Sequence, residues 1–282
     1  MIRSTGSPRQ AEDWALVLAS AGIPHSLAPA SGVWTLSVAD EDAVRGRIAL
    51  QAFEAEQAGP VLIPPPADRP IPWFLGVVAG ALLLASFVWT GTPRTGSRWF
   101  ERGAAVSPLM LAEPWRAVTA LTLHLDVAHV AGNAVATTLL LPAVAQRLGG
   151  GVGLFAVVVA GAVGNLLAAL IHAPGHAAVG ASTATFAAVG MLGALRWVRA
   201  PDDGRTPWKS WTVPAASLLL LALLGTARGS DVLAHATGFL AGAAAGALAA
   251  AVRRPLGPVA QAAFGILTAA IIAAAWLRAA WG

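Results

Sequence analysis

The chain has 282 residues, of which 56% are hydrophobic and only 11% are charged. A soluble domain carries about 25% charged residues, so the composition argues against a soluble class and indicates a polytopic membrane protein. The net charge of +4 comes almost entirely from arginine, which in a membrane protein sets topology more often than it binds nucleic acid. Cysteine is absent, which excludes disulfides, thiolate nucleophiles and cysteine metal sites.

Residues 1–60 are expected to form a small soluble α+β domain. The stretch AEDWALVLASAG fits a short amphipathic helix, and VWTLSV alternates apolar and polar residues like a strand. Asp40 is placed to cap a second helix through DAVRGRIALQAFEAE. Early acids and the lack of a long apolar core argue against a signal peptide. The Pro-rich residues 61–71 are expected to be a stiff linker.

Apolar segments follow, each approaching the length of about 20 residues that spans a bilayer. There are seven, at about residues 72–90, 126–147, 151–172, 180–199, 212–227, 231–252 and 258–277. The fifth is the shortest. The mixed polar connection 91–125 is expected to lie at the membrane surface. We find no internal repeat linking the two halves, which weakens a transporter interpretation.

Arginine and lysine between the segments predict the orientation. They concentrate after the second, fourth and sixth segments, at Arg147, Arg196, Arg199, Arg205, Lys209, Arg253 and Arg254. The positive-inside rule puts these connections and the N-terminal domain in the cytoplasm. The protein is then expected to be integral to the cell membrane, with the 91–125 connection outside.

Few polar residues enter the apolar segments, and no Asp, Glu, Lys or Arg lies in the middle of one. An ion-coupled pump usually needs a buried carboxylate, so this argues against a transporter or channel. His129, Ser182 and His235 lie near the outer starts of three segments that run in the same direction. At a rise of 1.5 Å per residue, they therefore share a shallow depth. Asn133 follows His129 by one turn on the same helix face.

The segment that carries His235 also repeats small residues at Gly238, Gly242 and Gly246. Such faces allow close helix approach, and the segment that begins at Ser182 is also rich in small residues. Close contact would bring the His235 imidazole to the Ser182 hydroxyl, which needs a base to act as a nucleophile. The Ser182 N–H, His129 and the Asn133 amide are suitable donors for an oxyanion.

Three further residues leave alternatives open. Asp231 stands one turn before His235. It could form a catalytic triad with Ser182 and His235, but we favour a role as the cap of the helix that carries His235. His172 and His176 have ligand-like spacing, but Pro174 and Gly175 interrupt the helix and no third ligand is evident. We therefore expect no metal site and no cofactor.

The ordered stretches EPWRAVTALTLHLDVAHVAGN (113–133), GAS (180–182) and AHATGFLAG (234–242) resemble the rhomboid family of intramembrane serine proteases. The resemblance covers residues 72–252 and implies a six-helix core, with 253–282 as an additional transmembrane helix. It implies Ser182 as nucleophile and His235 as general base. His129 and Asn133 resemble the oxyanion-stabilising pair, and Gly180 the first glycine of the family's Gly-x-Ser-Gly motif.

His124 matches a further histidine that supports the family's site, while Trp115 and Arg116 match a structural Trp-Arg pair. The family usually has glycine after the serine, where this chain has Thr183. The resemblance implies transmembrane proteins as substrates, the lipid bilayer as surroundings and a site that opens toward the outer face. The alternative is a catalytically inactive rhomboid-like protein that binds membrane-protein clients.

Overall fold

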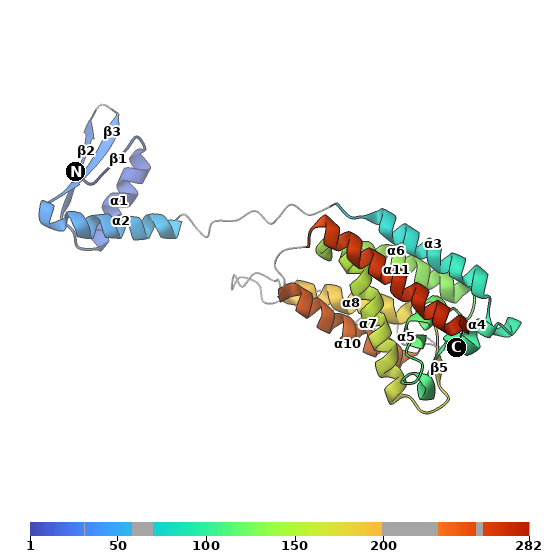
Figure 1. Ribbon diagram of the computed structural model, residues 1–282. Coiled ribbons are helices and arrows are strands. Elements are labelled where there is room, and N and C mark those ends of the chain that lie inside the picture. Colours follow the sequence, from blue (N-terminus) through green and yellow to red (C-terminus); the bar gives the residue numbers. More distant parts are fainter. Residues whose placement is uncertain (31, 58–69, 199–230, 252–255, 282) are drawn as a thin grey trace. The chain divides into compact units, whose positions relative to one another are not determined.

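The computed structural model describes residues 1–30, 32–57, 70–198, 231–251 and 256–281. The chain divides into two compact units, Met1–Ala67 and Asp68–Gly282 (Figure 1). The expected linker 61–71 and the expected fifth membrane segment 212–227 lie largely or wholly outside the described residues.

The N-terminal unit is an α+β fold, as expected. Its antiparallel sheet has the order β1-β3-β2, with β1 at Arg3–Thr5, β2 at His25–Ala30 and β3 at Val33–Val38. The helices are α1, Pro8–Ser20, and α2, Ala43–Gln57. Their shared core contains Trp14, Leu18, Ile23, Leu36 and Leu50.

The helix-capping role expected of Asp40 is wrong. Asp40 lies inside a 3₁₀ turn, η1 at Asp40–Asp42, and Ala39 is the residue that precedes this turn. The Ala39 carbonyl accepts a hydrogen bond from the Asp42 N–H at 3.0 Å. Three successive acidic residues thus form a separate turn, and α2 starts only at Ala43.

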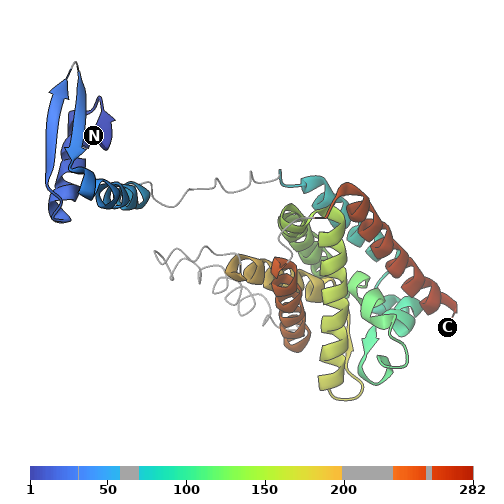
Figure 2. The same cartoon turned by 60° about the vertical axis from the view of Figure 1, so that its left-hand side comes forward.

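The second unit is a bundle of apolar helices, which confirms the polytopic all-α membrane fold. The helices are α3 (Trp73–Thr90), α6 (Val127–Leu148), α7 (Gly150–Ile171), α8 (Ser182–Val198), α10 (Val232–Ala251) and α11 (Pro258–Trp281). In the described part of the chain, five of them, all except α8, are long and apolar enough to cross a bilayer. Figures 1 and 2 show α7 in the middle of the bundle, where it contacts α6, α8, α10 and α11.

The 91–125 connection is folded into short elements. They are η2 (Pro93–Thr95), α4 (Arg98–Gly103), β4 (Ala105–Val106), η3 (Ser107–Leu109), α5 (Arg116–Thr119) and η4 (Ala120–Thr122). The buried Arg116 guanidinium pairs with Glu113 and donates to the Glu101 and Ala104 carbonyl oxygens. Arg116 therefore holds this connection together, which agrees with a structural role.

The same connection is tied to the segment between α7 and α8. Strand β4 pairs antiparallel with β5, Ala177–Ala178, and the Ser107 N–H donates to the His176 carbonyl oxygen at 2.9 Å. The Asn165 amide of α7 also donates to the Ala117 carbonyl oxygen of α5, at 3.0 Å. These bonds fix the backbone that leads into α8.

Candidate active site

Ser182 and His235 meet at the beginnings of two neighbouring helices. Ser182 is the first residue of α8, and His235 lies in the first turn of α10. His235 Nε2 and Ser182 Oγ lie 2.9 Å apart, which is within the reach that a base needs to activate a hydroxyl. His235 is buried, whereas Ser182 keeps partial exposure. Ser182 is thus partly open to its surroundings, while the His235 side chain is enclosed.

Small residues allow the two helices to approach. Gly238 lies against Thr183, Gly242 against Ala187 and Gly246 against Met191, each so close to α8 backbone that a Cβ at the glycine would collide with it. The expected close contact of these two helices is therefore confirmed. Because the contact begins one turn from His235, it sets the distance between the imidazole and Ser182.

Phe186 completes the surroundings of the His235 ring. The two ring centroids lie 4.5 Å apart with an interplanar angle of 34°. Our sequence analysis missed Phe186, although its position one helical turn after Ser182 places it on the same face of α8. The phenyl ring packs against the imidazole and limits its rotation.

His129 presents a donor nitrogen beside the serine. Asp126 caps α6 and accepts from the His129 N–H at 2.8 Å. His129 Nδ1 accepts the Leu125 N–H at 3.4 Å, so in the neutral ring the proton lies on Nε2. A Cβ on Gly180 would lie 2.6 Å from His129 Nε2 and 3.6 Å from Ser182 Oγ. A side chain at this position would collide with the His129 imidazole, so only glycine keeps the space beside Nε2 open.

Asn133 and the start of α8 supply further donors. The buried Asn133 amide donates to the His129 carbonyl oxygen at 3.0 Å, and its nitrogen carries a second hydrogen. The Ser182 N–H belongs to the first turn of α8, where backbone donors have no partner four residues earlier. The helix dipole also favours negative charge at this end. Together with His129, these groups can stabilise an oxyanion.

His124 positions the backbone that precedes the serine. Its Nε2 accepts the Ala181 N–H at 3.4 Å, and its ring lies 5.2 Å from that of His129. Burial and, to a smaller extent, nearby His129 lower the pKa of His124 to about 4, although a hydrogen bond with the Thr122 backbone acts in the opposite direction. His124 is therefore neutral at physiological pH, as its acceptor role requires.

The comparison with known families matches this arrangement. The family model described as Rhomboid domain matches residues 111–252, half of the chain, including α5 to α10 and every candidate site residue. The chain belongs to the rhomboid family. None of the curated proteins compared with it matches significantly. The resemblance predicted from the sequence is thereby confirmed, while the catalytic roles of the individual residues stay predictions.

Thr183 follows Ser182 at the position where the Gly-x-Ser-Gly motif has its last glycine. The residue is buried, and its Cγ2 atom lies 2.8 Å from the Cβ positions that Gly164 and Gly238 would have. A threonine fits after the serine because glycines face it from both α7 and α10. This packing accounts for Thr183 without displacing the Ser182–His235 pair.

Asp231 takes the capping role that we favoured. Its Oδ1 accepts the Ala234 N–H at 2.9 Å at the start of α10. Both carboxylate oxygens also bond to imidazoles, Oδ1 to His172 and Oδ2 to His176, so the carboxylate is engaged outside the dyad. Burial raises the pKa of Asp231, but the Ala234 N–H and the two imidazoles outweigh burial and hold this pKa below its usual value.

Proposed function

We propose that this rhomboid protein is an intramembrane serine endopeptidase, which hydrolyses peptide bonds in or near transmembrane segments of membrane-protein substrates. The 2.9 Å contact between His235 Nε2 and Ser182 Oγ carries the proposal. A serine hydroxyl is a weak nucleophile until an adjacent base accepts its proton. The surrounding apolar helices place this pair in an integral membrane protein.

In the first step, Ser182 Oγ attacks the substrate carbonyl carbon while its proton passes to His235 Nε2. The carbonyl oxygen becomes an oxyanion, which the Ser182 N–H, His129 Nε2–H and the second Asn133 hydrogen stabilise. The tetrahedral intermediate collapses, the C–N bond breaks, and the leaving amine takes the proton from His235. An acyl-enzyme ester on Ser182 remains.

In the second step, water gives a proton to His235 and attacks the ester carbon. The second tetrahedral intermediate releases the new carboxyl terminus, and Ser182 Oγ recovers its proton from His235. The net reaction adds one water to one peptide bond. No cofactor is required. The partial exposure of Ser182 provides the route for water and for an unwound substrate segment.

We further propose that the protein resides in the cell membrane with its N-terminus in the cytoplasm. Arg147 in the last turn of α6 and Arg196 in the last turn of α8 support this orientation. The starts of α6, α8 and α10, which carry the site, then face outside. Substrates are transmembrane proteins whose helix is unstable near that face, because a helical peptide bond must be exposed before it is attacked.

The proposal is tested by cleavage of a model transmembrane substrate by the purified protein in detergent. Ser182→Ala and His235→Ala are each expected to reduce cleavage by about 10³-fold or more. His25→Ala, in the N-terminal unit, is the matched control and should cleave like the wild type. Cleavage that persists in the Ser182→Ala and His235→Ala variants would refute the mechanism.

Labelling with a fluorophosphonate distinguishes an active enzyme from a client-binding, inactive rhomboid-like protein. The probe reacts with an activated serine, so we expect one label per chain, at Ser182, and none in Ser182→Ala. A folded wild-type protein that takes no label and cleaves no substrate would favour the inactive alternative, whose main support is Thr183.

A further inference from the structure

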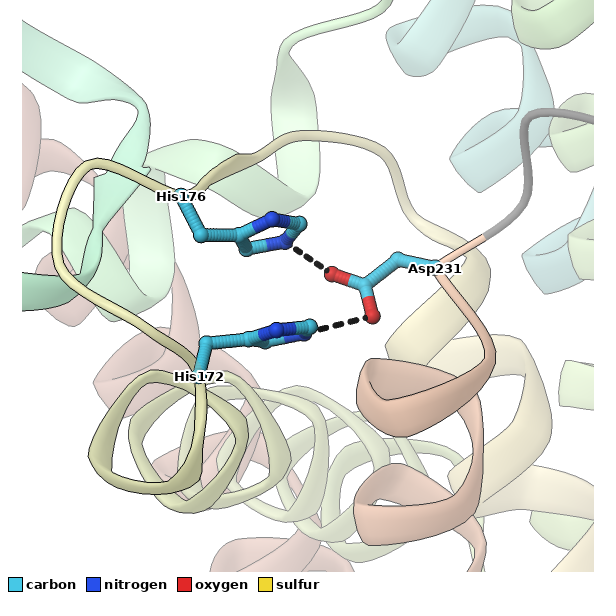
Figure 3. Close-up of side chains that lie close together, drawn as sticks. All are labelled: His172, His176 and Asp231. Atoms are coloured by element: carbon cyan, nitrogen blue, oxygen red, sulfur yellow. Dashed lines mark hydrogen bonds and ion pairs between the residues drawn. The ribbon is translucent and has the colours of Figure 1, made fainter.

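A cluster of side chains of the types that bind metals lies apart from the Ser182–His235 pair. It consists of His172, His176 and Asp231, which our sequence analysis did not bring together because Asp231 is distant in the chain. Figure 3 shows both imidazoles, from the α7–α8 connection, facing the Asp231 carboxylate at the start of α10. His172 Nε2 lies 2.9 Å from Oδ1, and His176 Nε2 lies 2.7 Å from Oδ2.

The turn that appeared to separate the two histidines in fact brings them together. His172 terminates α7, and Gly175, with φ of +93°, reverses the chain. The two rings therefore stack with centroids 3.6 Å apart and an interplanar angle of 16°. Strand β5 follows directly and pairs with β4, so the position of His176 is fixed by backbone hydrogen bonds.

We propose that His172, His176 and Asp231 form a binding site for a divalent transition-metal ion, with Zn²⁺ as the best fit. One ligand atom from each residue can be chosen so that all lie within 4.8 Å of one another. Two ligands each about 2.1 Å from one Zn²⁺ ion lie at most about 4.2 Å apart, so small rotations of the side chains close the site. Two imidazole nitrogens and a carboxylate oxygen are ligands that Zn²⁺ accepts, and Mg²⁺ and Ca²⁺ prefer sites built of oxygen.

The surroundings of the cluster suit an exchangeable ion. The exposed fraction of the side chain is 22% for His172, 17% for Asp231 and 33% for His176. An ion can therefore enter the site, and water can fill the remaining coordination position. In the metal-free protein, hydrogen bonds join the imidazoles to the carboxylate. Metal binding replaces these with coordination bonds, in which each neutral imidazole carries its proton on the ring nitrogen that does not bind the metal.

The bound ion would join two segments that are far apart in the sequence. The α7–α8 connection and the first residue before α10 would become linked through the metal. Because the folded protein alone brings these ligands together, the ion is expected to stabilise it. This inference concerns binding and does not depend on proteolytic activity.

The test uses the full chain, purified in detergent through a tag that contains no histidine. Titration with Co²⁺, a spectroscopic substitute for Zn²⁺, should give visible absorption bands that saturate at one ion per chain, and Zn²⁺ should displace them. Zn²⁺ should also raise Tm. His172→Ala and His176→Ala are each expected to weaken Co²⁺ binding at least about tenfold, because loss of an outer-shell group alone costs that much. Asp231→Asn retains the helix cap and should weaken binding similarly.

His25→Ala and His235→Ala are the controls, and both should still bind one ion. Elution volumes in size-exclusion chromatography show whether each variant is folded. If no saturable binding is found at millimolar Co²⁺ and Zn²⁺, the three side chains only form hydrogen bonds with one another, and the proposal is overturned. Binding that His235→Ala removes and His172→Ala retains would overturn it as well, because it would place the ion at the dyad.

Discussion

The side chain of Thr183 fills the space that Gly238 leaves open on the facing helix. A Cβ on Gly238 would lie 2.8 Å from Thr183 Cγ2, and it would also collide with the Thr183 carbonyl oxygen. The side chain that follows Ser182 therefore fits because α10 has no side chain at the facing position. Because His235 stands one turn before Gly238, this contact also sets the separation of the dyad.

We predict that Gly238→Ala reduces both stability and cleavage. The added methyl group overpacks the α8–α10 contact at a cost of about 1–3 kcal/mol and moves His235 away from Ser182. Gly132→Ala is the control, since Gly132 is exposed on α6 and a Cβ there meets nothing within 4 Å. That change should leave stability equal or improved. Tm and substrate cleavage are measured in parallel for each variant. If Gly238→Ala equals the wild type in both, the prediction is wrong.

Thr183→Gly is expected to lower stability while cleavage is retained. Glycine is a poorer helix former than threonine by roughly a few tenths of a kcal/mol, and the burial of the Thr183 methyl group, about 0.8 kcal/mol, is lost as well. The Thr183 side chain packs between Gly164 and Gly238. Gly242 and Gly246 also hold α10 against the backbone of α8, so fluorophosphonate labelling at Ser182 should persist. A large gain in labelling rate would instead mean that Thr183 restrains the nucleophile.

Gly180→Ala is expected to abolish cleavage. The φ of Gly180 is +124°, which L-residues rarely adopt, and the new Cβ would lie 2.6 Å from His129 Nε2. Gly96→Ala is the control for a positive φ without a collision: Gly96 has a φ of +66° and a Cβ there meets nothing within 4 Å, so it should cost only about 1–2 kcal/mol of stability and leave cleavage intact. Gly180→Ala should lose little further activity in a His129→Ala background, since the two changes disturb the same contact. Additive losses in kcat would refute this coupling.

The oxyanion donors should act mainly on kcat. His129→Ala and Asn133→Ala are each expected to lower kcat by about 10²–10³-fold with little change in KM, because their bonds strengthen as the oxyanion forms. Val135→Ala, at an exposed position on the same helix, should cleave like the wild type. Steady-state kinetics with a transmembrane substrate measure the split. A rise in KM with unchanged kcat would assign these residues to substrate binding instead.

Acidification should destabilise the protein through His124. Its folded-state pKa of about 4 lies below the usual 6.5 because the ring is buried. The folded state therefore prefers the neutral ring, and this contribution is present above about pH 6.5 and is lost as the pH falls toward 4, by up to about 3 kcal/mol. Tm measured across this range should fall, and His124→Gln should flatten the change. Equal slopes for the two proteins would rule out His124 as the cause.

The sequence by itself determined the membrane class, the apolar helices and the two residue types of the dyad. These features depend on local composition and on helical periodicity, which operate within a single segment. Gly238, Gly242 and Gly246 even indicated which helix faces meet, because small residues at four-residue spacing form a continuous strip on one side of a helix.

Only the tertiary structure decided how distant segments combine. The fit of Thr183 depends on Gly164 from another helix, and the third ligand beside His172 and His176 comes from Asp231 at the start of the neighbouring helix α10. In the sequence, Pro174 and Gly175 separate His172 from His176. In the structure, the turn that they form brings the two imidazole rings into a stack. Such contacts arise from chain reversal and helix packing, and sequence spacing does not encode the distance between residues on different elements.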